Sequence, residues 1–188
     1  MRDRDLISRV IERKPGAFDE FYYAYVDRVH RQLFTIVGPD AEIDDLIQLV
    51  FVQVYRRIHT FRGEARITTW LHRVTVNVAL THLRKRKRWF RWEGEERALL
   101  PEPDAPEQPD EAFGRREKLQ LLHKVLDRVK PKKRVVFLLY EVEGFTLEEI
   151  GEIVDAPVNT VAARLRAARL EVRRALERRL KASEAAVA

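Results

Sequence analysis

The sequence contains no cysteine, little glycine and no long apolar run. Its 188 residues include 7 glycines, and no segment approaches the about 18 apolar residues of a membrane span. Without cysteine, disulfide scaffolds, cysteine nucleophiles and cysteine zinc sites are excluded, and a reducing compartment is indicated. Scarce glycine and the lack of a fixed-period repeat argue against all-β, propeller and solenoid folds. The first ten residues are rich in charged side chains and lack the apolar core of a signal peptide, so we expect a cytoplasmic protein.

Charge, by contrast, is abundant and segregated along the chain. Lys and Arg number 36 against 30 Asp and Glu, and charged residues make up 35% of the sequence. Residues 62–92 carry nine basic side chains against one acid, and residues 157–181 carry eight against two. Between these blocks, residues 93–112 carry eight acids against one arginine. Clustered basic charge predicts a polyanionic partner.

The acidic segment also holds four of the eight prolines and lacks a helical or strand period. Such a segment cannot form a core, so we interpret it as a linker. The predicted organisation is therefore a domain over 1–92, a linker over 93–112, a domain over 113–182 and a tail over 183–188.

Apolar residues recur at three- and four-residue spacing in both domains, which predicts an all-α fold. Strand alternation has some support over residues 50–55, but the longer helical period around them favours a helix. Breaks at Pro15-Gly16 and Gly38-Pro39 delimit the first long helix. The other predicted helices cover about 41–59, 68–88, 119–130, 135–142, 147–154 and 160–180.

The helix over 41–59 is apolar on two sides. One stripe runs from Ile43 to Ile58, and a second combines Phe51 and Tyr55 with Leu49 and Val52. A surface helix needs only one apolar stripe. The helix is therefore either central in its own domain, with acids capping its first turn, or it presents its second face to a partner helix.

Residues 59–73 interleave aromatic and basic side chains where a loop enters a helix. Aromatic faces stack on unpaired bases and arginines hold phosphates, so Phe61 and Trp70 among arginines suit DNA whose strands have separated. Asn77 follows on the same helix, and an amide can read a base edge. The alternative interpretation places Trp70 in the core. The basic run 84–88 indicates phosphate contact.

Residues 146–176 have the pattern of a helix-turn-helix. Thr146 and Glu149 form a capping box, and Asp155-Ala156-Pro157 provides a tight turn. Leu147, Ile150 and Val154 are expected to face inward from the first helix. The second helix is predicted to bury Val161, Leu165, Ala168, Val172 and Leu176 and to expose a stripe of arginines. Such a stripe suits the major groove of DNA.

In this order the three motifs resemble the extracytoplasmic-function (ECF) group of bacterial RNA polymerase sigma factors. Residues 44–55 are similar to their polymerase-binding helix, and residues 61–77 to the segment that melts and reads the minus-ten promoter element. Residues 145–164 resemble the helix-turn-helix that reads the minus-thirty-five element. The resemblance covers about 17–180. It implies a region 2-like and a region 4-like domain that bind core RNA polymerase and promoter DNA and promote strand opening.

The resemblance implies three groups of binding residues and no catalytic residue. The polymerase-binding residues are Asp44, Asp45, Gln48, Phe51 and Tyr55. The minus-ten residues are Phe61, Arg62, Arg66, Thr69, Trp70, Arg73, Asn77, Arg84 and Arg86. The minus-thirty-five residues are Thr146, Asn159, Thr160, Arg164, Arg166, Arg169 and Arg173. Anti-sigma factors, common in the family, are a further implied partner class.

The chain departs from the family pattern at Asn159, where glycine is common, and at Ala162 and Ala163, where lysine and serine are common. These alanines remove two phosphate contacts, so upstream DNA binding is expected to be weaker or differently aimed. The acidic linker is longer and more charged than the family pattern, and we hypothesise that it mimics RNA in the polymerase cleft.

Two other function classes compete with this interpretation. A free-standing helix-turn-helix regulator would bind duplex DNA without polymerase and would need a dimer face or effector pocket. An enzyme acting on single-stranded nucleic acid would need an acid, base or metal cluster, and the basic region 62–92 offers only Glu64. No metal or cofactor is predicted, because the five histidines lack metal-ligand spacing with carboxylates and there is no phosphate-binding glycine loop.

Overall fold

The computed structural model describes the backbone of residues 2–63, 66–92 and 122–187 and the side chains of 4–63, 66–88 and 122–178. The predicted all-α class is confirmed. A short helical segment covers 122–126. The helices are α1 (Arg2–Ile11), α2 (Ala17–Val37), α3 (Ile43–Arg57), the 3-10 helix η1 (Ile58–Thr60), α4 (Ile67–Trp92), α6 (Pro131–Glu141), α7 (Leu147–Val154) and α8 (Val158–Val187).

The predicted helices are found, with differences at several ends. The helix predicted over 119–130 is helical over 122–126 among the described residues and gives way to a turn at 127–129, and the helix predicted over 68–88 continues to Trp92. Helix α6 begins at Pro131 rather than near Val135, because proline is compatible with the first helical turn, where its missing N–H has no partner to lose. Helix α8 continues to Val187, so the predicted tail is helical to that point. Good helix formers and the lack of a breaker explain the extension. The predicted linker over 93–112 lies outside the described residues.

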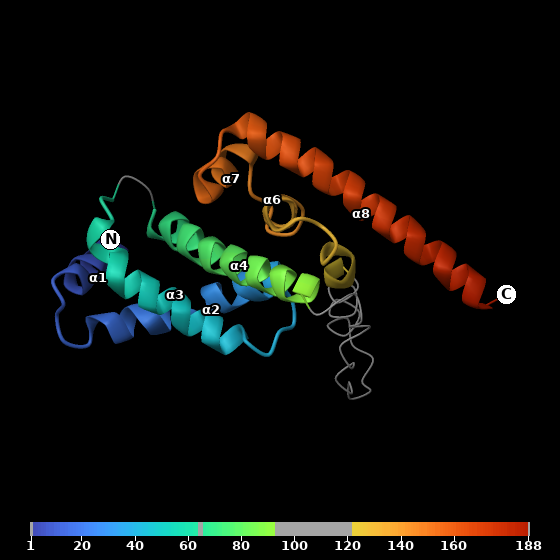
Figure 1. Cartoon of the computed structure of the whole chain (residues 1–188). Helices are drawn as coiled ribbons and strands as arrows, with labels where there is room; N and C mark the ends of the chain where they lie inside the picture. Colours follow the sequence, from blue (N-terminus) through green and yellow to red (C-terminus); the bar gives the residue numbers. More distant parts are fainter. Residues whose placement is uncertain (1, 64–65, 93–121, 188) are drawn as a thin grey trace.

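Helices α1 to α4 form the N-terminal domain and α6 to α8 the C-terminal domain (Figure 1). Phe21 and Leu33 of α2, Val50 of α3 and Leu71 of α4 are each no more than 1% exposed in the N-terminal core. No helix within 2–63, 66–92 and 122–187 is long and apolar enough to span a membrane.

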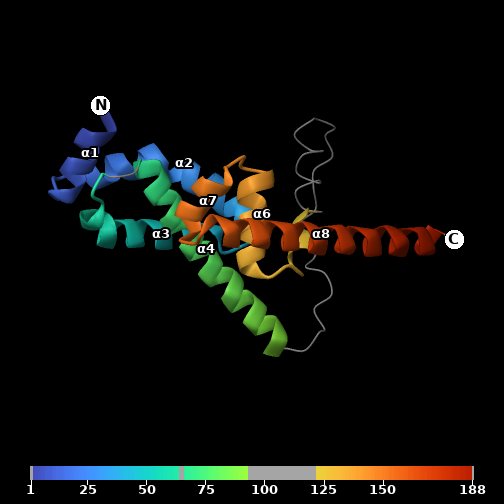
Figure 2. The same ribbon diagram turned by 90° about the horizontal axis from the view of Figure 1, so that it is seen from above.

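The two domains pack directly against each other. Helix α4 contacts both α6 and α7, and α2 contacts α6. One continuous cluster of buried apolar side chains includes Val50 and Leu71 of the N-terminal domain and Leu139 and Ile150 of the C-terminal domain. Most of α8 projects away from this contact (Figure 2). The apolar contact makes the two domains a closed pair in this structure.

Candidate nucleic-acid and partner-binding surfaces

Helix α3 presents an exposed face that combines acidic, amide and apolar groups. Leu49, Val52 and Tyr55 are 50%, 43% and 51% exposed. Asp44, Asp45 and Gln48 are exposed beside them. We call these six residues the α3 face. Since a large exposed apolar group is unfavourable in water unless a partner covers it, this composition is typical of a docking surface.

Phe51 does not belong to the α3 face. Of the two arrangements that the sequence left open for its stripe, Phe51 takes the buried one, and its contact with polymerase stays a prediction. Its side chain is 4% exposed, and its ring lies 4.6 Å from that of Tyr22 and 6.5 Å from that of Phe18. Both partners come from α2, which covers this edge of α3. Leu49 and Val52 take the exposed positions instead, because they lie further round the helix from α2.

The loop and the first half of α4 line a cleft of about 960 Å³. Seven of the nine predicted minus-ten residues line it: Phe61, Arg62, Arg66, Thr69, Trp70, Arg73 and Asn77. The rings of Phe61 and Trp70 lie edge to face at 6.0 Å and are both half-buried. Trp70 packs on the core and also faces the cleft, so both interpretations of this residue apply in part.

The opposite wall of the cleft is formed by the C-terminal domain. Phe145, Glu149, Glu152, Ile153 and Asp155 line it. Three acids thus stand across the cleft from the arginines of the N-terminal domain. Arg73 and Asp155 approach to 4.0 Å between Nη2 and Oδ1. The ring of His72 lies 5.1 Å from that of Phe145, and burial together with the charge of Arg28 lowers the pKa of His72 to about 4.

The other two predicted minus-ten residues lie elsewhere. Arg84 is exposed and does not line the cleft. Arg86 is turned toward the domain boundary, where its guanidinium donates to Asp40 at 3.1 Å and to Asp127 at 2.7 Å. The structure therefore does not place Arg86 with the aromatic cleft residues. Nothing in its sequence spacing signalled this, because Asp127 belongs to the other domain.

The predicted helix-turn-helix is present in α7 and α8. Thr146 Oγ1 accepts from the Glu149 N–H at 3.2 Å, and the Thr146 N–H donates to Glu149 Oε2 at 2.9 Å, which confirms the capping box. Asp155 ends α7 in the left-handed conformation, with φ of 50°. Ile150 and Ile153 are buried, whereas Leu147 and Val154 are half-buried. The left-handed residue Asp155 ends α7, and the chain enters α8 three residues later.

The outer side of α8 carries most of the predicted minus-thirty-five residues. Asn159, Arg166 and Arg173 are exposed, and Thr160 and Arg164 are half-buried. Arg169 is already engaged, because its Nε donates to Glu141 at 2.6 Å and its guanidinium lies 5.3 Å from the ring centre of Tyr140. The Glu141 carboxylate raises the pKa of Arg169. Leu176 is 38% exposed, so its predicted inward position is wrong.

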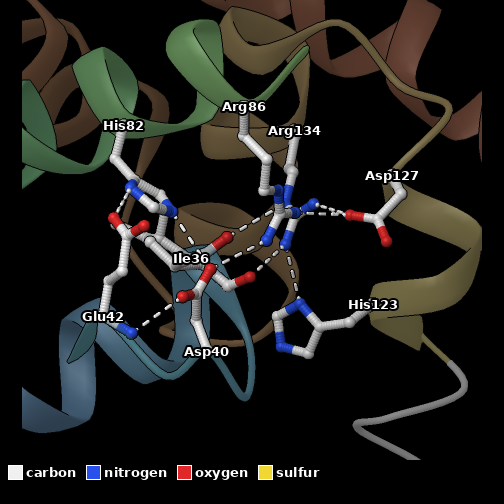
Figure 3. A network of polar contacts seen from close by, with 9 residues as sticks. Ile36, Asp40, Glu42, His82, Arg86, His123, Asp127 and Arg134 are labelled. Atoms are coloured by element: carbon white, nitrogen blue, oxygen red, sulfur yellow. Dashed lines mark hydrogen bonds and ion pairs between the residues drawn. The ribbon is translucent and has the colours of Figure 1, made fainter. Parts of the chain in front are cut away.

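A polar network joins the domains beside the second half of α4, where His82 and Arg86 take part in it (Figure 3). Arg134 of α6 is 2% exposed. Its guanidinium donates to the carbonyls of Ile36 and Val37 at 2.9 Å each, to His123 Nδ1 at 2.9 Å and to Asp127 at 2.7 Å. Burial lowers the pKa of Arg134 against the opposing effect of Asp127. Two carbonyls, one imidazole nitrogen and one carboxylate thus accept hydrogen bonds from this single buried guanidinium.

Asp40 and His123 complete this network. His82 Nε2 lies 3.0 Å from Asp40 Oδ2, and this hydrogen bond, helped by Arg86, lowers the pKa of Asp40 to about 2. Burial and the neighbouring Arg134 lower the pKa of His123 to about 4. Gly38 leaves room for the His123 ring, since a Cβ there would lie 2.8 Å from Cγ of that ring.

An all-helical pair of domains, one with an aromatic-basic cleft and one with a helix-turn-helix, defines a class of DNA-reading proteins, and comparison with known proteins agrees. Residues 21–89 match the model of Sigma-70 region 2, and residues 119–172 match that of Sigma-70, region 4. The chain is 30% identical over 182 residues to the RNA polymerase sigma-H factor of Pseudomonas aeruginosa, covering 94% of each chain. It is 27% identical to the ECF RNA polymerase sigma-E factor of Escherichia coli K12, covering 90% of this chain and 91% of that one.

The chain belongs to the ECF subfamily of RNA polymerase sigma factors. Two solved structures share its fold at 18% sequence identity. CnrH in complex with the cytosolic domain of CnrY has a TM-score of 0.63, with coverage of 94% of this chain and 98% of that chain. The Bartonella quintana sigma factor RpoE, in complex with the anti-sigma factor NepR, has a TM-score of 0.62, with coverage of 86% and 98%.

Proposed function

We propose that this sigma factor binds core RNA polymerase through the α3 face, holds unpaired minus-ten bases in the cleft of α4 and reads duplex DNA upstream with α8. The single observation that carries the proposal is the convergence of seven predicted minus-ten residues on one cleft. The match covers 94% of the length of the sigma-H relative, so the proposed function is compared with that of nearly the full relative.

The cleft favours strand opening because its aromatic rings can stack on unpaired bases but not on bases within a duplex. Stacking of an unpaired base on an aromatic ring contributes about 1–3 kcal/mol, and this contribution exists only after the base leaves the duplex. Phe61 and Trp70 supply adjacent rings, while Arg62 and Arg66 are exposed beside them for phosphates. Binding therefore favours the opened strand over the closed one. We infer that the protein acts by binding alone, without catalysing a covalent step.

The upstream interaction is carried by the exposed side of α8. Arg166 and Arg173 project from a helix whose opposite side is buried through Val161, Leu165 and Ala168. An anchored helix with exposed arginines can enter the major groove, where guanidinium groups recognise guanine. Arg169 would first have to leave Glu141 and Tyr140, so we assign it a weaker contribution.

We also propose a cytoplasmic anti-sigma protein as a regulatory partner. Two proteins of the same fold were solved as complexes, one with a cytosolic domain and one with an anti-sigma factor. A partner that covers the α3 face or the cleft would compete with polymerase or with promoter DNA.

Reconstituted transcription with purified core polymerase tests the proposed function. We expect the chain to direct initiation from a defined set of sites on genomic DNA, mapped by the 5′ ends of the transcripts. Core polymerase alone and core polymerase with an unrelated sigma factor are the controls. Failure of the chain to bind core polymerase or to change the start sites would overturn the proposal.

A further inference from the structure

Helix α1 ends in a turn that holds an arginine where glycine is the usual residue. The Lys14 N–H donates to the Arg9 carbonyl at 2.9 Å. The Arg13 N–H donates to the Val10 carbonyl at 3.1 Å, and the two bonds together form a Schellman motif. Arg13 takes the left-handed position of this motif, with φ of 55°. Glycine is common at this position because a Cβ is unfavourable in the left-handed region.

The conformation of Arg13 is the more unusual of two similar cases. Arg13 and Asp155 are the non-glycine residues with positive φ in the part of the chain that the structure describes. Aspartate tolerates the left-handed region because its short polar side chain can bond to nearby backbone groups, whereas an arginine gains no such compensation. Backbone strain of this kind clusters where a side chain has a functional position. We therefore expect the side chain of Arg13 to have a role that glycine could not perform.

The guanidinium of Arg13 lies over a ring of the α3 face. Its Cζ atom is 5.7 Å from the ring centre of Tyr55, which is within the range of about 6 Å for a cation–π interaction. Phe18 of α2 meets the same ring edge to face, with ring centres 5.1 Å apart and planes at 83°. Figure 1 shows α1 beside the end of α3 that carries Tyr55. Two residues outside α3 thus hold a ring that is still 51% exposed.

Helix α1 is itself fixed, so the Arg13 side chain starts from a rigid support. The apolar side of α1 is buried in the N-terminal core through Leu6 and Val10. Arg9 pairs with Glu20 of α2 at 2.9 Å between Nη1 and Oε2. Because the helix cannot turn freely, its last residues can fix the orientation of a neighbouring aromatic ring.

The next residue along the chain has the same charge but a different contact. Lys14 is exposed like Arg13, and its Nζ pairs with Glu12 at 2.9 Å. Glu12 also accepts from Ser8 Oγ at 3.0 Å, which holds this pair on the surface of α1. Among the described residues, the cation that lies over the Tyr55 ring is that of Arg13. Lys14 is therefore a matched control for the loss of one positive charge from this turn.

We propose that Arg13 is a positioning residue of the polymerase-docking surface, which holds the ring of Tyr55 in the orientation that core polymerase binds. The proposal rests on the proposed function of the α3 face. An exposed side chain loses conformational freedom when a partner covers it, and fixing its orientation beforehand reduces this cost of binding. The turn after α1 thus belongs to the docking surface, although Arg13 acts through Tyr55 rather than on polymerase.

Arg13→Met removes the cation from the ring and keeps a long, flexible side chain. The affinity of the full chain for core polymerase should fall about fivefold, which corresponds to the loss of an exposed cation–π contact. Lys14→Met should change the affinity less than about twofold, and Arg13→Lys should retain most of the binding because it keeps a cation for the ring. Fluorescence anisotropy of the labelled chain measures all three. Equal losses for Arg13→Met and Lys14→Met would mean that net charge alone governs binding, and would overturn the proposal.

A double-mutant cycle separates positioning from a direct contact with polymerase. In the Tyr55→Leu chain there is no ring to hold, so adding Arg13→Met should weaken polymerase binding no further. A direct ion pair between Arg13 and polymerase would be lost by the same factor with either residue at position 55. That result would show that Arg13 is not a positioning residue.

Arg13→Gly separates binding from folding. Glycine adopts positive φ without strain, and this relief offsets the greater freedom that it gives the unfolded chain. The variant should therefore unfold at about the temperature of the wild type, measured by circular dichroism, and still bind polymerase about fivefold more weakly. If Arg13→Gly is as stable as the wild type and binds polymerase equally well, the Arg13 side chain has no role in docking.

The outcomes also distinguish this inference from the proposed function. If the wild-type chain binds core polymerase and Arg13→Met binds as tightly, the role of Arg13 is wrong while the docking function of the α3 face stands. If the wild-type chain does not bind core polymerase, the proposed function is wrong and the role of Arg13 falls with it.

Discussion

The two working surfaces of the N-terminal domain differ in chemistry and in accessibility. The α3 face is acidic and apolar and lies open, whereas the α4 cleft is basic and aromatic and is faced by acids of α7. A positively charged surface attracts negatively charged groups of the same molecule unless distance or packing keeps them apart. In this structure the basic cleft is faced by acids of the same chain, whereas the α3 face is free to meet an external partner.

The largest effect is expected from placing charges on the α3 face. Leu49→Asp with Val52→Asp should weaken core polymerase binding at least about 100-fold, because central apolar contacts of an interface are often worth 2 kcal/mol or more each. Fluorescence anisotropy of labelled sigma factor measures this. Val142→Asp with Leu170→Asp is the matched control, since those side chains are 43% and 47% exposed on the C-terminal domain. Equal losses would remove the special role of the α3 face.

Replacing the ring of Trp70 tests whether the cleft binds unpaired bases by stacking. Trp70→Leu keeps an apolar side chain against the core but removes the aromatic face, so strand opening by the polymerase complex should lose about 1–3 kcal/mol. Fluorescence of a base analogue in the minus-ten region measures opening. Trp70→Phe should retain most of the activity. If leucine and phenylalanine serve equally well, Trp70 acts through the core rather than by stacking.

The upstream surface offers a comparison within one helix. Arg166→Ala should reduce the preference for the upstream element by about 1–3 kcal/mol. Arg169→Ala should cost less, because Arg169 already binds Glu141 in the free protein. Competition between matched and mismatched upstream DNA in the polymerase complex measures both preferences. A larger loss for Arg169 would show that its ion pair is given up on DNA and that the wrong arginine was placed first.

The smallest expected effect is that of pH on closure. His123 accepts from Arg134 through Nδ1, so it must be neutral there, and its pKa is lowered to about 4 in the closed form. The opened form binds protons more tightly, so closure is fully stable above about pH 6.5 and weakens as the pH falls toward 4. The loss at pH 5.5 should not exceed about 1.4 kcal/mol.

Single-molecule energy transfer between dyes on Tyr23→Cys and Glu177→Cys measures this closure, since both positions are exposed and lie in different domains. Arg134, Asp127 and Arg86 are the charged groups that act on His123. His123→Gln should remove the dependence between pH 6.5 and 5. A pH dependence that persists in His123→Gln would assign it to another group.

Local patterns predicted much of the molecule because their physical causes are local. The capping box of α7 needs only Thr146 and Glu149, three residues apart, and the break before α2 needs only Pro15 and Gly16. Among the cleft residues, Trp70, Arg73 and Asn77 share one face of α4 because of the helical period, and Phe61, Arg62 and Arg66 lie in the loop directly before that helix. The burial of Phe51 could not be decided from local pattern, because it depends on Phe18 and Tyr22 of another helix.

The order of apolar, aromatic and basic residues along the chain was sufficient to determine two helical domains, the helix-turn-helix and the family, because helix periodicity and capping act over a few residues. Tertiary structure alone decided that Arg134 binds the end of α2, that Arg86 faces Asp127 and that acids of α7 oppose the cleft. Arg134 and Ile36 are 98 residues apart. Spacing along one helix carries no information about such a contact, which depends on how two separately folded surfaces fit together.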